Sequence, residues 1–348
     1  MILVTGGTGW LGSRVVTALK DGNLPDVGLP DLTGGHRVRC LALDSEPAAH
    51  LIDDGVEVIR GSVTDPGSLK PFFAGAEGAI LIHLAGVIHP PMFNVGLFDE
   101  VNHQGPRNVV NAAIDAGVRR AVIMSSNSPF GGNRRNTDVF TEESPYNPYM
   151  GYGRSKRKME EMLKDTMQRT SSTEIVIVRA PWFYGPNQPA RQTEFFSMIR
   201  QGRFPMVGNG RNRRSMGYVD NLTQGIMRAA YHEAAPGKAF WIADARPYEM
   251  REIISTVADV MAQDFGFEVR PQRLKLPGIA SDVARLTDGC LQAVGVYQQK
   301  IHVLSELNMN IACSIDYTNK IIGYEPKIEL REGMKKSIEW CLQSGLKL

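Results

Sequence analysis

Short apolar runs alternate along the first half of the chain with stretches whose apolar residues recur at helical spacing. The runs are Ile2–Val4, Val38–Leu43, Val56–Arg60, Ala79–His83 and Val118–Met124. Between them, the residues from Leu11 to Leu19 and those from about 95 to 116 have an amphipathic pattern. Unbroken apolar runs are typical of strands buried on both faces of a parallel sheet, and their alternation with helices indicates βαβ units. The pattern predicts an α/β fold with a doubly wound parallel (Rossmann) sheet and right-handed crossovers.

Three glycines at a spacing of three follow the first run: Gly6, Gly9 and Gly12. The order strand, glycine turn and helix is what a dinucleotide fingerprint requires, and this context argues against an ordinary glycine-rich turn. Gly6 can take backbone angles that are closed to other residues, and Gly9 lets the chain approach a pyrophosphate. Gly12 lets the helix lie near the strand, and the start of that helix offers free N–H groups to phosphates.

An acidic residue, Asp44, follows the second predicted strand. A carboxylate at this place can accept both ribose hydroxyls of NAD, although an Asp here could equally cap a helix. Leu43 offers no charge to a 2′-phosphate, whereas Arg14 could. The sequence therefore favours NAD and leaves NADP possible.

Composition narrows the class of protein. The 348 residues are 43% apolar and 22% charged, as in ordinary soluble globular proteins, and the net charge of +2 predicts no nucleic-acid partner. The four cysteines (Cys40, Cys290, Cys313, Cys341) show no metal-ligand spacing, so we expect no metal and free thiols in a reducing cytoplasm. No apolar run approaches membrane-spanning length, and the predicted fold begins at residue 2, without room for a signal peptide. We therefore expect a cytoplasmic protein without a membrane partner.

A serine-rich strand end and a Tyr-x-x-x-Lys pair suggest catalysis. Ser125 and Ser126 end the Val118–Met124 strand, and Tyr152 and Lys156 lie one turn apart on a predicted helix. The pair alone is a weak signal. Its place behind strand-end serines and a glycine fingerprint makes it specific.

Together these segments resemble the extended short-chain dehydrogenase/reductase superfamily, of the NAD-dependent epimerase/dehydratase type. The resemblance covers nearly the whole chain and is most specific at Thr5–Gly12, Asp65, His83–Gly86, Asn102, Ser126, Tyr152, Lys156, Tyr184–Pro186, Tyr218–Asp220 and Asp316–Pro326. It implies that Tyr152 is a general acid/base whose pKa is lowered by Lys156 and the cofactor ring. Ser126 would hydrogen-bond the same substrate oxygen.

The resemblance also implies roles for neighbouring residues. Ser128 could share the task of Ser126, whereas we expect the Ser125 hydroxyl to be satisfied by backbone. Asn102 would support the geometry of the site, and His83 alone is more typical of a packed core histidine. The implied cofactor-binding residues are Gly6, Gly9, Trp10, Leu11, Gly12, Asp44, Val63, Asp65, Leu84, Ala85, Gly86, Tyr152, Lys156 and Pro181. Asp65 would contact adenine, although an Asp before Pro66 is equally a helix cap.

The pattern changes beyond Arg179. We expect residues 1–180 with about 216–243 to form the dinucleotide-binding domain, and about 181–215 with 244–348 to form a smaller, mostly helical substrate domain. Arg214 stands where nucleotide-sugar members keep a pyrophosphate-binding arginine, although it could be a solvated residue of a basic loop. Trp182 replaces the usual asparagine of the sugar-nucleotide epimerases. It could pack on a sugar, widen an apolar pocket or be a core aromatic.

In the 4,6-dehydratases of this family, an Asp-Glu pair directly follows the active-site hydroxyl residue. This chain has Asn127 and Ser128 there. Neither side chain does acid–base work near neutrality, so dehydration is disfavoured. The predicted substrate contacts are Ser126, Asn127, Ser128, Trp182 and Arg214.

The resemblance favours an epimerase that acts on a nucleotide-activated sugar through a transient keto intermediate. The alternative is a dehydrogenase or reductase similar to the 3β-hydroxysteroid group. A cofactor-binding sensor is disfavoured by the intact serine, tyrosine and lysine. A homodimer through the helices at about 95–116 and 149–168 is also expected.

Overall fold

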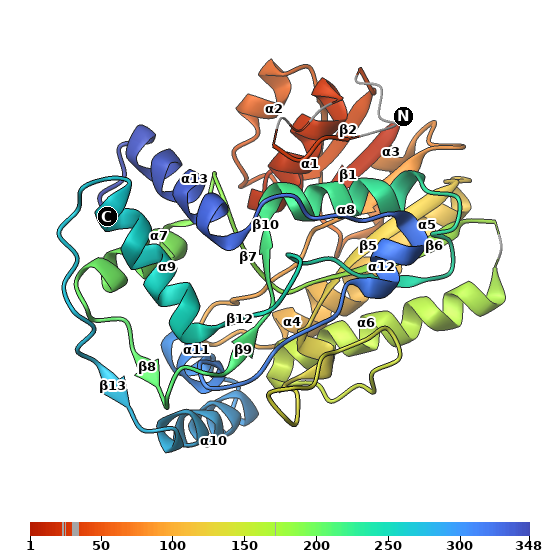
Figure 1. Ribbon diagram of the computed structural model, residues 1–348. Helices are drawn as coiled ribbons and strands as arrows, with labels where there is room; N and C mark the ends of the chain where they lie inside the picture. Colours follow the sequence, from red (N-terminus) through yellow and green to blue (C-terminus); the bar gives the residue numbers. More distant parts are fainter. Residues whose placement is uncertain (23, 25, 30–34, 171) are drawn as a thin grey trace.

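A parallel sheet of seven strands forms the centre of the computed structural model, which describes residues 1–22, 24, 26–29, 35–170 and 172–348 (Figure 1). The strand order is β11-β6-β5-β4-β1-β2-β3, and every neighbouring pair is parallel. The strands are β1 (Ile2–Thr5), β2 (Val38–Ala42), β3 (Glu57–Arg60), β4 (Ile80–His83), β5 (Arg120–Ser126), β6 (Glu174–Ala180) and β11 (Ala239–Trp241). This order confirms the predicted doubly wound sheet.

Helices cover both faces of the sheet because successive strand residues point to opposite sides. Ile2 and Val4 of β1 pack in one apolar core with α1 (Trp10–Asp21) and α8 (Val219–Tyr231). Leu3 packs in a second core on the other face. The helices of that second core are α3 (Pro66–Phe73), α5 (Gly105–Asp115) and α6 (Met150–Arg169), while the short α2 (Ala49–Asp53) precedes β3. Both faces of the sheet are therefore buried, as the unbroken apolar runs predicted.

The helix expected from about 95 to 116 is interrupted. It consists of α4 (Leu97–Asp99), a π-helical turn over Glu100–Gln104 and α5. The π-helical turn contains Asn102, which is fully buried. Such turns accommodate one extra residue and often occur at functional sites.

The remaining elements form the part of the molecule that lies mostly below and to the left of the sheet in Figure 1. Short strands pair here: β7 (Trp182–Tyr184) with β10 (Met216–Tyr218), β8 (Met206–Val207) with β13 (Lys275–Leu276), and β9 (Arg213–Arg214) with β12 (Tyr248–Glu249). The helices are α7 (Ala190–Arg200), α9 (Met250–Gln263), α10 (Ile279–Ala293), α11 (Gln299–Glu306), α12 (Asp316–Ile322) and α13 (Leu330–Gln343). This region is mostly helical, as expected, and β11 returns to the central sheet. The exact domain boundaries stay a prediction.

The outward surface of α6 is charged. Arg154, Arg157 and Lys158 are exposed there, and Lys158 pairs with Asp99 at 2.6 Å. Among the described residues, the large exposed hydrophobic side chains lie elsewhere, above all on α10 and near Phe93. The homodimer expected through the helices at about 95–116 and 149–168 stays a prediction, and the exposed surface of α6 is polar.

The four cysteines are free thiols. Across the described ranges, no helix is both long and apolar enough to cross a membrane.

Candidate active site

The glycine turn brings the start of α1 against the end of β1. Gly6 has a φ of 74°, and a Cβ there would lie 2.7 Å from the backbone nitrogen of Ala85. A Cβ at Gly12 would lie 1.9 Å from the carbonyl oxygen of Gly6. Only glycine fits these two positions, which confirms the reasons given for them from the sequence.

The residues around the turn hold it in place. Gly9 caps α1 and donates its N–H to the Gly6 carbonyl at 3.0 Å. The Trp10 indole donates to the Pro186 carbonyl at 2.6 Å, and its ring lies 4.7 Å from that of Phe183. Leu11 is buried in the core. The side chains of Trp10 and Leu11 are thus structural, and contacts of these two residues with a cofactor would come from their backbone.

The loop after β4 forms the opposite wall of the expected cofactor site. Leu84, Ala85 and Gly86 lie here, and a Cβ at Gly86 would lie 3.1 Å from the Asn102 side-chain oxygen. Asn102 fixes the loop, since its amide donates to the Val87 carbonyl at 2.7 Å and accepts from the Val87 N–H at 2.8 Å. Close-packed glycines on both walls, facing a helix N-terminus, fit a dinucleotide. The described residues contain no cluster of three or more side chains suited to hold a metal ion.

His83 is a core residue, as expected. Its Nδ1 lies 2.7 Å from the Thr5 hydroxyl, and burial lowers its pKa to about 3. A neutral imidazole of this kind holds β1 and β4 together.

The acidic residue that contacts the glycine turn is Glu46. Its carboxylate accepts from the Thr8 hydroxyl at 2.9 Å and from the Leu43 N–H at 3.1 Å. Asp44 is exposed beyond β2, and its ribose contact stays a prediction. Glu46 was not singled out from the sequence, where Asp44 directly follows the strand and is the more obvious carboxylate.

Arg14 does not offer its charge to a 2′-phosphate. Its guanidinium makes two hydrogen bonds of 2.7 Å to the buried carboxylate of Asp220. Although burial opposes it, this pairing raises the pKa of Arg14, and it corrects the suggestion that Arg14 could bind NADP.

Asp65 caps α3, which was the alternative that the sequence left open for this residue. Its carboxylate accepts from the Gly67 N–H at 2.9 Å, and its contact with adenine stays a prediction. Val63 is buried beside α5, where its carbonyl accepts from Asn108 at 3.1 Å. Pro181 is buried directly after β6, at the same edge of the sheet as Ser126.

Ser126 and Tyr152 are brought together by close contact between α6 and the loop after β5. A Cβ at Gly153 would lie 2.5 Å from the Ser128 carbonyl, so the helix start lies directly against that loop. Met150 opens the helix with a strained φ of 51°. Burial raises the pKa of Tyr152, and the nearby Ser126 hydroxyl partly offsets that effect. The phenol and the serine hydroxyl can therefore face one substrate oxygen, as the resemblance implied.

Lys156 lies on the same face of α6, one turn beyond Tyr152 and almost fully buried. Its ammonium donates to the Met124 carbonyl at 2.9 Å, and burial lowers its pKa to about 8. The lowering of the Tyr152 pKa by Lys156 and the cofactor ring stays a prediction, and burial of the phenol raises that pKa in this structure.

Ser125 is structural, but its partner is a carboxylate rather than backbone. Its hydroxyl donates to Glu160 at 2.6 Å, and Arg179 pairs with the same carboxylate at 2.7 Å. The Glu160 carboxylate also accepts from the Tyr146 hydroxyl at 2.7 Å. The fully buried pair of Glu160 and Arg179 thus fixes α6 against β5 and β6.

Arg214 and Trp182 meet on the substrate side. Arg214 is only 7% exposed, so the solvated alternative is wrong, and its guanidinium lies 6.0 Å from the centre of the half-buried Trp182 ring. Arg214 donates to the Glu306 carbonyl at 2.9 Å, and the Glu306 carboxylate lies 3.9 Å away. Phe195 packs against Trp182 at 5.4 Å. Asn127 and Ser128 are half-buried in the loop after β5, beyond Ser126.

A polar cluster on α10 and α11, which the sequence analysis missed, borders Tyr152. Asp288 pairs with His302 at 2.7 Å and accepts from Gln292 at 2.9 Å. Gln292 in turn accepts from the Gly151 N–H at 3.0 Å, at the start of α6. The negative charge of Glu306 raises the pKa of Tyr152. No spacing could have indicated this cluster, because its members come from two helices that meet each other and the start of α6 only in the fold.

Aromatic side chains and a histidine lie near Tyr152, around Tyr297. The Phe98 ring lies 6.0 Å from Tyr152 and 5.7 Å from Tyr297. His89 bonds the Tyr297 hydroxyl at 2.6 Å, and burial, with a smaller effect of the Arg191 charge, lowers the pKa of His89 to about 4. Arg191, exposed at the start of α7, is therefore a second cation in the neighbourhood of His89, which the sequence did not single out.

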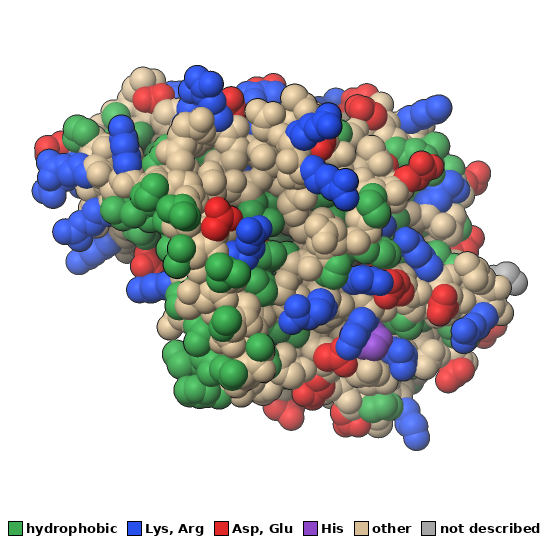
Figure 2. All heavy atoms as spheres, turned by 90° about the horizontal axis from the view of Figure 1, so that it is seen from below, with side chains coloured by type: hydrophobic (Ala, Val, Ile, Leu, Met, Phe, Trp, Pro, Cys, Tyr) green, Lys and Arg blue, Asp and Glu red, His purple; other side chains and the backbone are tan. Residues whose placement is uncertain are grey.

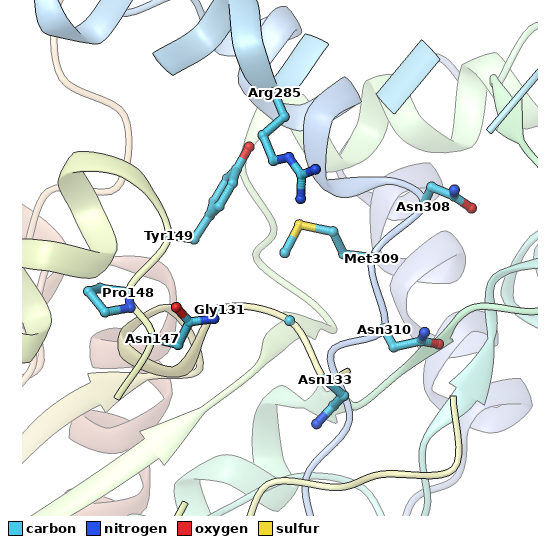
Figure 3. Close-up of a pocket in the computed structure, with 10 residues that line it drawn as sticks. Gly131, Asn133, Asn147, Pro148, Tyr149, Arg285, Asn308, Met309 and Asn310 are labelled. Carbon is cyan, nitrogen blue, oxygen red and sulfur yellow. The ribbon is translucent and has the colours of Figure 1, made fainter. Parts of the chain in front are cut away.

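A cavity of about 380 Å³ opens beside the start of α6. Figure 3 shows Tyr149, Arg285 and Met309 around its centre, while Asn308 and Asn310 turn away from it. Its lining comes from the loops at 131–133 and 147–149, from α10 and from residues 308–310. Tyr149 precedes Tyr152 by about one helical turn, so the cavity lies near Tyr152, although its lining contains none of Ser126, Tyr152 and Lys156.

Comparisons with known proteins show the family and the fold. The model of the NAD dependent epimerase/dehydratase family matches residues 2–243. An uncharacterized protein of Sinorhizobium fredii, y4nL, is 54% identical over 99% of this chain and 96% of its own length. The UDP-glucose 4-epimerase of Vibrio cholerae is 24% identical over 99% and 96%. The structure of DesIV, a dTDP-glucose 4,6-dehydratase from Streptomyces venezuelae with NAD and TYD bound, superimposes with a TM-score of 0.73 at 23% identity, covering 98% of this chain and 97% of that one.

Proposed function

Because this chain belongs to the NAD-dependent epimerase/dehydratase family, we propose that it is an epimerase that inverts a carbon of a nucleotide-activated sugar through a transient ketone. The observation that carries the proposal is the gathering of Ser126, Tyr152 and Lys156, together with a buried Arg214 whose neighbour Glu306 also acts on the pKa of Tyr152. The first group suits reversible alcohol oxidation, and a buried guanidinium suits a diphosphate.

In the proposed reaction Tyr152 accepts the proton of the sugar hydroxyl and returns it after inversion. Ser126 hydrogen-bonds the same oxygen and fixes its orientation. Lys156 holds a positive charge beneath the phenol and orients the bound cofactor. Bound NAD supplies the hydride acceptor and donor.

Arg214 would hold the pyrophosphate. Of the five N–H donors of a guanidinium, one makes a hydrogen bond in the described structure, to the Glu306 carbonyl. Donors therefore remain for two phosphate oxygens. Trp182 would pack on the sugar face, and Arg191 could add a second cation.

Dehydration remains disfavoured under this proposal. Asn127 and Ser128 cannot move protons near neutrality. Glu306 is the carboxylate nearby, and it is held between Arg214 at 3.9 Å and His302 at 3.8 Å. Its carboxylate is thus engaged with two side chains of the protein.

The second candidate is a dehydrogenase or reductase that acts on a less polar alcohol or ketone. It is favoured by the aromatic side chains around the site, with Trp182 against Phe195 and Phe98 against Tyr297. The same three catalytic residues would serve it.

We further propose NAD rather than NADP, because the carboxylates of Asp44 and Glu46 lie near the place for the adenosine ribose and would repel a 2′-phosphate. A cytoplasmic homodimer is part of the same proposal.

The test is to identify what the protein binds. The purified protein is denatured and the released small molecules are identified by mass spectrometry, while UDP and dTDP are titrated into the intact protein by calorimetry. A nucleotide sugar, or saturable binding of a nucleoside diphosphate, supports the epimerase. An apolar hydroxy or keto compound without nucleotide binding supports the second candidate.

A further inference from the structure

The helix α10 carries its apolar residues on the outside. Ile279 is 66% exposed, Val283 57%, Leu286 71% and Val294, at the end of the helix, 75%. At 3.6 residues per turn these four positions fall within an arc of about 100° on one side of the helix. We call these four residues the α10 patch.

The buried side of the same helix is polar. Ser281 donates to the Ser305 carbonyl at 2.7 Å, Asp288 pairs with His302, and Gln292 accepts from Gly151. Hydrogen bonds therefore hold α10 in place, while its apolar side chains face outward. This arrangement reverses that of an ordinary surface helix and marks an interaction surface.

The patch continues onto a neighbouring loop. Phe93 is 79% exposed, and the carbonyl of the adjacent Met92 accepts from the Tyr297 N–H at 2.6 Å, close behind Val294. Figure 2, seen from below Figure 1, shows hydrophobic side chains gathered at the lower left, over α10. Aliphatic side chains and one phenylalanine thus share one side of the molecule.

The surroundings of the patch are basic. Residues 270–303 contain five basic and two acidic residues, and one of the acids, Asp288, is buried against His302. The other acid, Asp282, pairs with Arg285 at 3.0 Å. Arg273, Lys275 and Lys300 are exposed and have no ion pair among the described residues. An apolar helix face with an uncompensated basic rim is complementary to an anionic lipid surface.

We propose that the α10 patch docks on an anionic lipid bilayer, with the helix lying in the plane of the interface. Leucine, isoleucine and phenylalanine enter the boundary between headgroups and acyl chains, and the basic rim contacts anionic headgroups. A second copy of the chain fits less well, because a two-fold contact through α10 would bring one basic rim against the other.

This docking needs no membrane-spanning segment. The expectation of no membrane partner rested on the lack of an apolar run long enough to span, and a helix lying in the interface escapes that criterion. The inference is independent of the proposed reaction, since lipid binding is measured without turnover.

The experiment is co-sedimentation of the full chain with vesicles of phosphatidylcholine alone or with phosphatidylglycerol. The test variant is the double substitution Val283→Ser and Leu286→Ser. The control is Ile52→Ser on α2, where the side chain is similarly exposed at 55%. We expect the protein to sediment with the anionic vesicles and less with phosphatidylcholine alone. The double variant should bind at least about tenfold more weakly, because two apolar side chains no longer leave water, and the control should bind normally.

Thermal unfolding and light scattering complete the test. All substitutions are at exposed positions, so unfolding midpoints should stay unchanged. Absence of binding to anionic vesicles, or equal binding by the double variant, would overturn the proposal. So would a dimer that binds no vesicles and dissociates in the double variant, since the patch would then be an interface between copies.

Discussion

The guanidinium carbon of Arg214, on β9, lies 6.0 Å from the centre of the Trp182 ring, on β7. The two side chains suit different substrates. A buried cation recognises a diphosphate, whereas an aromatic face recognises a sugar ring or an apolar skeleton. Substituting each of the two side chains in turn therefore tests which of the two candidate substrate classes the protein uses.

Arg214→Ala should raise KM and leave kcat less changed. Loss of one charge-assisted contact to a pyrophosphate costs about 1.5–3 kcal/mol of binding when ground and transition states use it equally. Arg213→Ala is the matched control, since Arg213 donates to the Asn136 carbonyl in a loop. Steady-state kinetics would check this. If Arg214→Ala leaves kcat/KM intact while Trp182→Ala abolishes it, the less polar substrate class is correct.

Tyr152→Phe should lower kcat by about 10²–10⁴-fold, the usual contribution of a general acid/base. Cofactor binding should survive because the aromatic ring remains. Tyr149→Phe, one turn earlier and bonded to Ser305, is the control for loss of a phenol near the site. A Tyr152→Phe enzyme with near-normal turnover would remove Tyr152 from its proposed role.

Lys156→Met should weaken NAD binding as well as turnover, unlike Tyr152→Phe. Burial lowers the pKa of Lys156 to about 8 in the free protein, so its positive charge is lost as pH rises through that value. NAD affinity, measured by calorimetry, should therefore fall above about pH 8 in the unaltered protein and stay flat in Lys156→Met. The same pH trend in both proteins would contradict this role.

His302→Asn should destabilise the protein in a pH-dependent manner. Although burial opposes it, the Asp288 and Glu306 carboxylates raise the pKa of His302. The stabilisation by protonated His302 is then complete below the unfolded pKa of about 6.5 and is lost as pH rises through the raised value. We expect a loss of about 1.5–3 kcal/mol near pH 5.5 that shrinks towards pH 8.

Urea unfolding at several pH values measures that loss. The control is His36→Asn, because burial lowers the pKa of His36 and the linkage has the opposite sign. A loss for His302→Asn that does not change with pH would contradict the charged pair.

NAD should bind more tightly than NADP. Glu46→Ala should narrow the difference more than Asp44→Ala, because Glu46 contacts the glycine turn through Thr8 whereas Asp44 is exposed. Isothermal titration with both cofactors tests this. Tighter NADP binding by the unaltered protein would show the assignment to be wrong.

Local chemistry made part of this structure predictable. Gly6 and Gly12 were predictable because backbone angles and close approach exclude every other residue there. The strands were predictable because burial on both faces leaves an unbroken apolar run. Tyr152 and Lys156 were predictable because one helical turn separates them.

Other features depend on contacts between distant segments. Glu46, rather than Asp44, meets the glycine turn because the chain folds back after β2. The Asp288–His302 pair forms where α10 packs on α11. The π-helical turn contains Asn102, whose side chain binds the backbone of Val87. Sequence periodicity carries no signal for these tertiary contacts.

The central claim is inversion of a nucleotide sugar with recycling of the cofactor. The most direct measurement incubates the protein with NAD and a panel of nucleotide sugars, and follows NADH absorbance together with the NMR spectrum of the sugar. The account predicts an equilibrium mixture of two sugar epimers with no net NADH. Stoichiometric NADH accumulation, loss of water from the sugar, or no change in any nucleotide sugar alongside oxidation of an apolar alcohol would contradict it.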